Sequence, residues 1–251
     1  MLIVALILAV GIGIALGLLG GGGSILTVPI LTYAIGMETK EAIAASLFVV
    51  GVTSATGAIA HARAGRIRWR TGLIFGAAGM AGAFAGGRVA AYIPGTVLMF
   101  LFAGMMIATA IAMLRKRAPL IDSASIARDL PVGKVLIEGA VVGVVTGIVG
   151  AGGGFLVVPA LVLLGGLSME VAVGTSLVVI AMKSFAGLAG HLGHVDVDWR
   201  TTLAITAAAV IGSLIGGQLA GRIPGPALRR GFGWFVLAMA AFILAKQLGV
   251  G

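Results

Sequence analysis

Apolar runs divide the chain into segments long enough to cross a bilayer. Runs of about 20 residues, the length that spans roughly 30 Å of hydrocarbon, occupy 42–60, 71–92, 96–114, 170–190, 201–222 and 228–248. Two longer apolar regions, 2–35 and 135–166, are each interrupted by a glycine cluster. The pattern predicts an all-α polytopic membrane protein of about eight transmembrane helices, with the first helix of each half broken at its glycine cluster.

The two glycine clusters belong to an internal repeat. The sequence GLLGGGGSILTVP at 17–29 returns as GIVGAGGGFLVVP at 147–159, so each residue lies 130 positions before its counterpart. His61 and Trp69 return in the same register as His191 and Trp199. Internal repeats are typical of secondary transporters. We therefore divide the chain into an N-terminal membrane repeat at 1–114, a linker at 115–134 and a C-terminal membrane repeat at 135–251.

The charges of equivalent loops predict that the two repeats have inverted topology. The loop 61–70 carries four arginines and no acid, whereas its counterpart 191–200 carries Asp196, Asp198 and a single arginine. Lys and Arg collect in cytoplasmic loops of membrane proteins. The first loop and the basic linker 115–134 are therefore expected on the cytoplasmic side, and the second loop on the opposite side.

The opening region of each repeat is predicted to be re-entrant. Inverted repeats need an odd number of membrane crossings in each repeat. Because three full spans follow the opening region, it has to enter and leave on one side. The stretch 25–35 is too short to cross a bilayer of about 30 Å. The alternative, two full spans in each opening region, would also give an odd number of crossings.

Composition places the chain in a bilayer and excludes several function classes. Hydrophobic residues make up 60% and charged residues 10%, whereas soluble domains average about 25% charged. The net charge of +9 is explained by cytoplasmic loops, and no motif accompanies it that would bind nucleic acid. The absence of cysteine excludes a thiolate metal site. Because motifs for nucleotide binding and for catalysis are also absent, we expect neither an enzyme nor a metal or cofactor.

The glycine clusters are the first part of a candidate substrate site. Glycine costs about 1 kcal/mol relative to alanine inside a helix, so such clusters indicate backbone that is unwound or closely approached. A helix that restarts after the cluster presents free N–H groups to an anion, although close packing alone is the alternative, as expected for Gly82 and Gly212. The candidate residues are Gly20, Gly21, Gly22, Gly23, Ser24, Gly150, Gly152, Gly153 and Gly154.

A lysine and a set of hydroxyls complete the candidate site. Lys183 lies in an otherwise uncharged run, where a cation costs about 3 kcal/mol. No intramembrane acid is evident as its partner, so we expect an anionic substrate there; the alternative is that its stem snorkels to the interface. Hydroxyl residues also recur at helical spacing in the segment that contains Lys183 and in its counterpart in the first repeat. They form either a permeation path or interhelical contacts. They are Ser46, Thr53, Ser54, Ser176 and Ser184.

The repeated motif resembles a known family. The pattern G-x-x-G-x-G-G-G-x-x-x-x-P at 147–159, its variant at 17–29, the sequence GTSL at 174–177 and a Ser-x-x-Gly-x-x-x-His segment in each half are similar to the sulfite exporter TauE/SafE family. The chain departs from the family pattern at Ser24, at Ala44-Ala45 and at Lys183, where many relatives are expected to carry Asn.

The resemblance implies a multi-pass permease of the cell inner membrane that exports sulfite, sulfonates or related organic anions. Its partners would be a small anionic substrate and the lipid bilayer, with coupling to protons or to sodium left open. Two other classes stay open. An anion channel could use the same site, and a membrane assembly protein would transport nothing.

Overall fold

The computed structural model describes residues 2–90, 95–115, 132–149, 154–191 and 197–247, and all regular structure within these ranges is helical. The first half contains α1 (Leu2–Leu19), the 3-10 turn η1 (Gly20–Gly23), α2 (Ser24–Pro29), the π-helical η2 (Ile30–Ile35), α3 (Thr39–Arg63), α4 (Trp69–Ala90) and α5 (Gly95–Arg115). The second half contains α6 (Val132–Val149), α7 (Gly154–Leu163), α8 (Met169–His191), α9 (Trp199–Ala220) and α10 (Gly225–Gln247). The candidate residues Gly150, Gly152 and Gly153 and most of the linker lie outside the described residues.

Four of the described helical segments are long and apolar enough to cross a membrane, namely Glu41–Arg63, Met169–Ala189, Trp199–Ala220 and Gly225–Ala245. Large apolar side chains stand exposed on the outside of the bundle, among them Ile7, Phe84, Ile137, Ile211 and Trp234. A surface of this kind suits lipid rather than water. The prediction of an all-helical polytopic membrane protein is confirmed at this level.

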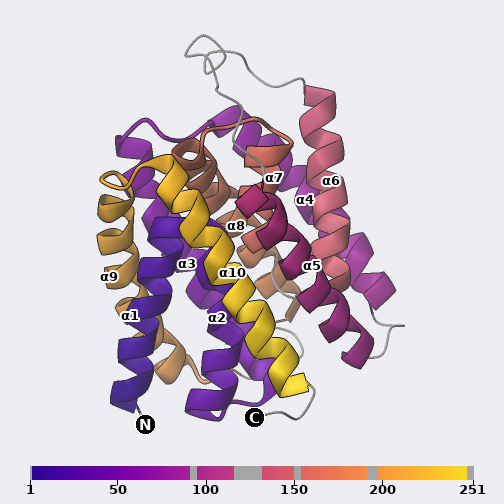
Figure 1. Ribbon diagram of the computed structural model, residues 1–251. Helices are drawn as coiled ribbons and strands as arrows, with labels where there is room; N and C mark the ends of the chain where they lie inside the picture. Colours follow the sequence, from indigo (N-terminus) through magenta and orange to yellow (C-terminus); the bar gives the residue numbers. More distant parts are fainter. Residues whose placement is uncertain (1, 91–94, 116–131, 150–153, 192–196, 248–251) are drawn as a thin grey trace.

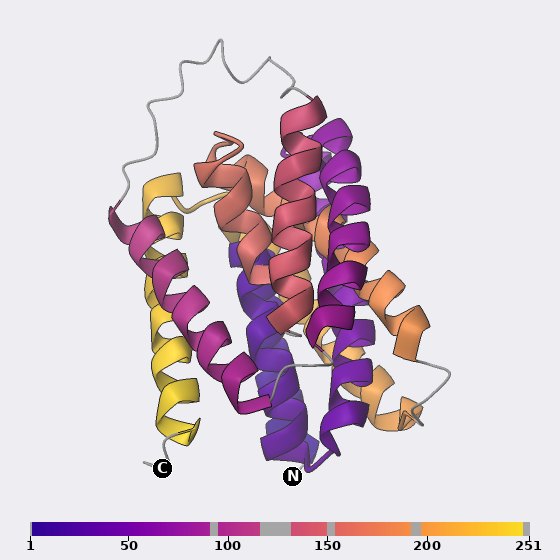
Figure 2. The same cartoon turned by 90° about the vertical axis from the view of Figure 1, so that its right-hand side faces the viewer.

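The helices are arranged as pairs on either side of a central layer. In Figure 1, α1 lies beside α9 at one side of the bundle and α4 lies beside α6 at the other, with α3 and α8 between them. The helices α5 and α10 pack against each other, and Figure 2 shows them together at one side. Each pair joins one helix of the first half to one helix of the second.

The helix ends fall on two opposite faces of the bundle. The chain termini lie at one end, where η2 gives way to α3 and where α8 ends and α9 begins (Figures 1 and 2). The opposite end carries the turns from α3 to α4, from α7 to α8 and from α9 to α10 (Figures 1 and 2). The opening segments α1–η2 and α6–α7 therefore each return to the end at which they begin.

Glycine lets the paired helices touch through their backbones. A methyl group on Gly13 of α1 would lie 1.9 Å from the carbonyl oxygen of Ala209, and one on Gly143 of α6 would lie 2.4 Å from that of Gly79. A methyl on Gly212 would come within 2.1 Å of the Val10 oxygen, and one on Gly82 within 2.3 Å of the Ala140 oxygen. The close packing predicted for Gly82 and Gly212 is confirmed. These two contacts of the α1–α9 pair correspond, 130 residues apart, to the two contacts of the α4–α6 pair.

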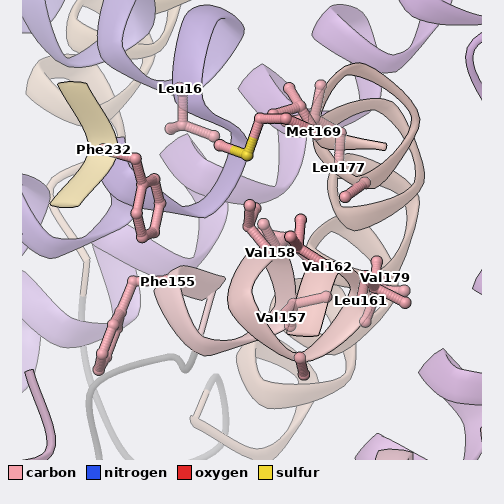
Figure 3. Close-up of a cluster of buried hydrophobic side chains, with 14 of the residues drawn as sticks. Leu16, Phe155, Val157, Val158, Leu161, Val162, Met169, Leu177, Val179 and Phe232 are labelled. Atoms are coloured by element: carbon pink, nitrogen blue, oxygen red, sulfur yellow. The ribbon is translucent and has the colours of Figure 1, made fainter. Parts of the chain in front are cut away.

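The short helix α7 is enclosed by protein. Side chains from α1, α8 and α10 converge on it in Figure 3, including Leu16, Leu177, Val179 and Phe232. Its own residues Phe155, Val157, Val158, Leu161 and Val162 are buried. A segment of 10 residues could not span the hydrocarbon layer, and short or irregular backbone at membrane depth is tolerated where protein covers it.

Candidate substrate-binding site

The glycine turn of the first half meets the start of α7. A methyl group on Gly21 would lie 1.7 Å from the carbonyl oxygen of Gly154 and 2.6 Å from the amide nitrogen of Phe155, so the two segments touch backbone to backbone. Gly20 has φ of +66°, a conformation that a side chain disfavours. A methyl there would also lie 2.5 Å from the Ser176 hydroxyl. The structure thus brings together candidate residues that are 130 or more positions apart.

Ser24 fills the position that corresponds to Gly154. Its hydroxyl donates a hydrogen bond of 2.6 Å to the Gly21 carbonyl oxygen. The same hydroxyl would lie 2.7 Å from a methyl on Gly154. Gly22 and Gly23 complete the η1 turn, with Gly23 against the backbone of Ile12. Ser24 therefore links the turn to the second half of the chain.

Lys183 ends inside the bundle on a neutral partner. Its side chain is 8% exposed, and Nζ donates a hydrogen bond of 2.9 Å to Oγ1 of Thr146 in α6. The Thr146 hydroxyl donates in turn to the Gly143 carbonyl oxygen at 3.0 Å. The stem passes α4, with Cδ 3.6 Å from the position of a methyl on Gly79. Among the described residues, no carboxylate forms an ion pair with Lys183.

One turn of helix separates Lys183 from the glycine contact. Ile180 of α8 lies 3.3 Å from the position of a methyl on Gly154. Lys183 follows three residues later, and residues three apart share a helix face. The ammonium group, the start of α7 and the glycine turn therefore belong to one region of the interior.

The candidate hydroxyls are all buried, and they differ in their hydrogen bonds. Ser176 donates to the Val173 carbonyl oxygen at 2.8 Å, in the manner usual for serine in a helix. Thr53 and Ser54 are fully buried, yet neither hydroxyl has a hydrogen-bond partner. Ser46 and Ser184 are buried in α3 and α8 respectively. The Thr53–Ser54 pair thus retains free hydrogen-bonding capacity in the interior.

Two interactions of buried side chains, one at the site and one beside it, were not predicted from the sequence. One is the Lys183–Thr146 hydrogen bond; Thr146 is the single hydroxyl residue of α6, which was the available indication. The other joins His61 to the first glycine of the motif, with Nε2 3.2 Å from the carbonyl oxygen of Gly17. Because a carbonyl oxygen only accepts, His61 donates through Nε2.

Comparison with known proteins agrees with this architecture. The family described as "Sulfite exporter TauE/SafE" matches residues 5–243. A "Probable membrane transporter protein" of Xylella fastidiosa (strain 9a5c) is 34% identical and aligns with 98% of each chain. "Probable membrane transporter protein YdhB" of Bacillus subtilis is 28% identical, covering 85% of this chain and 88% of the relative.

A similar protein also occurs in an archaeon. "Probable membrane transporter protein MJ0441" of Methanocaldococcus jannaschii is 32% identical over 76% of this chain and 73% of its own length. No solved structure gives a significant match to the chain. The doubled glycine motif, the enclosed half-length helix and the family match across nearly the whole length lead to one conclusion: this chain belongs to the sulfite exporter TauE/SafE family of membrane transporters.

Proposed function

We propose that the chain is a gradient-driven secondary transporter that exports a small sulfur-containing or organic anion, such as sulfite or a sulfonate, across the cell inner membrane. One observation carries the proposal: the glycine turn at Gly21 touches the start of α7 at Gly154, which lies beside Ile180 of α8, and the buried Lys183 follows Ile180 by one helical turn. The family match supports the same class of substrate.

The transporter is built from two inverted repeats, 1–114 and 135–251, joined by a cytoplasmic linker at 115–134. The reciprocal glycine contacts of α1 with α9 and of α6 with α4 support this arrangement. A further support is that the turn from α3 to α4 lies at one end of the bundle, whereas α8 ends and α9 begins at the other (Figures 1 and 2). By the positive-inside rule, the arginines of the α3–α4 connection support a cytoplasmic position for this end.

In this arrangement each repeat contributes one broken opening element and three spans, giving about eight elements that cross or enter the membrane. Every residue of α7 except the half-buried Leu156 and Leu163 is buried, which supports a re-entrant segment. Glycine turns allow backbone rearrangement at low steric cost, and contacts without side chains allow one repeat to shift against the other. The glycine turns would then act as hinges between two access states.

The residues around the turn supply what an oxyanion requires. Lys183 provides a positive charge, and the start of α7 provides the positive end of a helix dipole. Hydroxyls of Ser184 and the Thr53–Ser54 pair add neutral donors. Because the region is buried, these interactions are stronger than they would be in water. The absence of a nucleotide-binding motif leaves an ion gradient, of protons or of sodium, or the gradient of the substrate itself as the energy source.

Purified protein in liposomes tests the proposal. Sulfite flux should saturate with concentration, and a proton or sodium gradient should drive sulfite uphill. Flux that stays proportional to concentration and never runs uphill would indicate an anion channel instead. A complete lack of flux for sulfite, sulfonates and carboxylates would indicate a protein with a non-transporting role.

A further inference from the structure

We propose that His61 and Arg66 form a second oxyanion-binding site at the end of the bundle where α3 connects to α4. This inference rests on the proposed function and extends it: the site would hold the transported anion between the cytoplasmic face and the glycine turn. Neither residue belongs to the central site around Gly21, Gly154 and Lys183.

The connection that carries both residues is held firmly in place. The amide of Arg66 donates to the carbonyl oxygen of His61 at 2.9 Å, which closes a tight turn. Gly174 of α8 packs against this turn, since a methyl there would lie 2.4 Å from the Arg66 carbonyl oxygen and 3.0 Å from Cβ of His61. The amide of Arg68 donates to the Thr175 hydroxyl at 3.0 Å. The turn is therefore attached to α8 at two successive residues.

One face of α9 places the two side chains next to each other. A methyl on Gly217 would lie 3.8 Å from Nε2 of His61, and a methyl on Gly221, the C-cap residue that continues α9 with a helical backbone, would lie 2.6 Å from Nη2 of Arg66. Residues four apart lie on the same face of a helix, about 5–6 Å from each other. The imidazole ring and the guanidinium group thus cover adjacent positions along the glycine face of α9.

Both side chains keep a buried polar atom without a partner. His61 is 1% exposed and uses Nε2 for Gly17, while its Nδ1 has no hydrogen-bond partner. Nη1 of Arg66 is also buried and unpartnered. Among the described residues, no carboxylate forms an ion pair with Arg66. Buried polar atoms are seldom left unpaired in folded proteins, so these two atoms have hydrogen-bonding capacity that a ligand could satisfy.

The two free atoms define the ligand. A guanidinium N–H donates to an ionised oxygen, and Nδ1 of a neutral histidine that donates through Nε2 accepts a hydrogen. An oxyanion with one ionised oxygen and one hydroxyl, such as hydrogensulfite, satisfies both. Because His61 is bonded to Gly17, three residues before the η1 turn begins, an anion at this site lies within about one helical turn of the hinge.

Calorimetric titration of the purified protein with sodium hydrogensulfite tests this site separately from transport. The Lys183→Met variant removes the central ammonium, so the binding that remains in it reports on Arg66. Adding Arg66→Gln should weaken that binding about ten- to a hundred-fold, the loss expected for one charged hydrogen bond. Adding Arg63→Gln instead removes the same charge from an exposed arginine at the end of α3, three residues before Arg66. This change should leave the binding unchanged.

Three results would overturn the site: no binding in Lys183→Met alone, equal binding with and without Arg66→Gln, or equal losses with Arg66→Gln and Arg63→Gln. Arg66→Lys guards against a folding artefact, because it retains the charge and should bind several-fold more weakly than Arg66 while eluting as the same folded species. Failure of the proposed function has a different signature. Hydrogensulfite would then bind at Arg66, but wild-type liposomes would show no uphill flux.

Discussion

Lys183 of α8 and Thr53 of α3 hold equivalent positions in the two repeats, yet their surroundings differ. Lys183 reaches the Thr146 hydroxyl by passing beside Gly79. The residues 130 positions earlier or later are Leu16 and Ala209, which offer neither a hydroxyl nor the space of a glycine. The Thr53 hydroxyl accordingly has no partner. The glycine packing is repeated in both halves, whereas the polar contacts are not, so the site that we propose is asymmetric although the helix packing around it is nearly symmetric.

The largest expected effect comes from the contact that both halves share. Gly21→Ala places a methyl 1.7 Å from the Gly154 oxygen, so backbone has to move on both sides. We expect loss of transport and a fall of about 1–3 kcal/mol in the free energy of unfolding, measured by flux and by thermal unfolding. Gly11→Ala is the control, because that glycine of α1 has no atom within 4 Å of its added methyl. Equal behaviour of the two variants would refute the contact.

The next effect separates the two equivalent positions. Lys183→Met keeps the length of the side chain and removes its charge, and it should lower sulfite flux about ten- to a hundred-fold, as loss of a charged hydrogen bond does. Thr53→Val keeps the shape and removes an unpartnered hydroxyl, so its effect should be smaller. Similar losses in both variants would mean that the two halves contribute equally to binding.

A third variant tests the partner of Lys183. Thr146→Val leaves the ammonium buried without its acceptor, which should cost about 1–3 kcal/mol of stability. Thr146→Ser keeps the hydroxyl and serves as the control. Thermal unfolding in detergent measures both, and unchanged unfolding of Thr146→Val would show that the hydrogen bond contributes nothing.

The smallest effect compares the starts of the equivalent helices α9 and α4. Asp198 accepts hydrogen bonds from the Thr201 hydroxyl and from the amides of Thr201 and Arg200, whereas its counterpart Arg68 cannot accept any. These bonds, the Thr201 hydroxyl foremost, hold the pKa of the Asp198 carboxyl below its usual value.

A carboxyl whose pKa is lowered by folding stabilises the protein above its unfolded pKa, about 3.9 for aspartate. That stabilisation is lost as pH falls through the folded pKa. Asp198→Asn should therefore unfold at a slightly lower temperature than wild type near neutral pH, and the difference should shrink as the pH falls below about 4. A difference that is independent of pH would contradict this role of the carboxylate.

Hydropathy was sufficient to locate most helices. The apolar run 42–60 lies within α3, and 201–222 nearly coincides with α9 (Trp199–Ala220). The length of a membrane-spanning helix is set by the thickness of the bilayer, so it can be predicted from the local sequence alone. The glycine cluster at 20–23 likewise coincides with the end of α1 and the η1 turn.

Contacts between helices could not be read in the same way. Nothing local to Lys183 indicates that Thr146, 37 residues away, accepts its hydrogen bond. The bond from His61 to Gly17 also depends on which helices become neighbours. The π-helical turn of Ile30–Ile35 follows Pro29, but a proline predicts only a disturbed helix, not its form. The role of the glycine and hydroxyl residues as a substrate site stays a prediction.

The inverted arrangement of the repeats is tested most directly by labelling from one side of the membrane. The chain has no cysteine, so Ala64→Cys and Arg200→Cys, both at exposed positions beyond the two equivalent helices, can each carry a single thiol. A membrane-impermeant maleimide applied to intact cells should label Arg200→Cys, and should label Ala64→Cys only after the membrane is opened. Labelling of both thiols from the same side would contradict the inverted repeats and, with them, the meeting of the two glycine segments at a shared anion site.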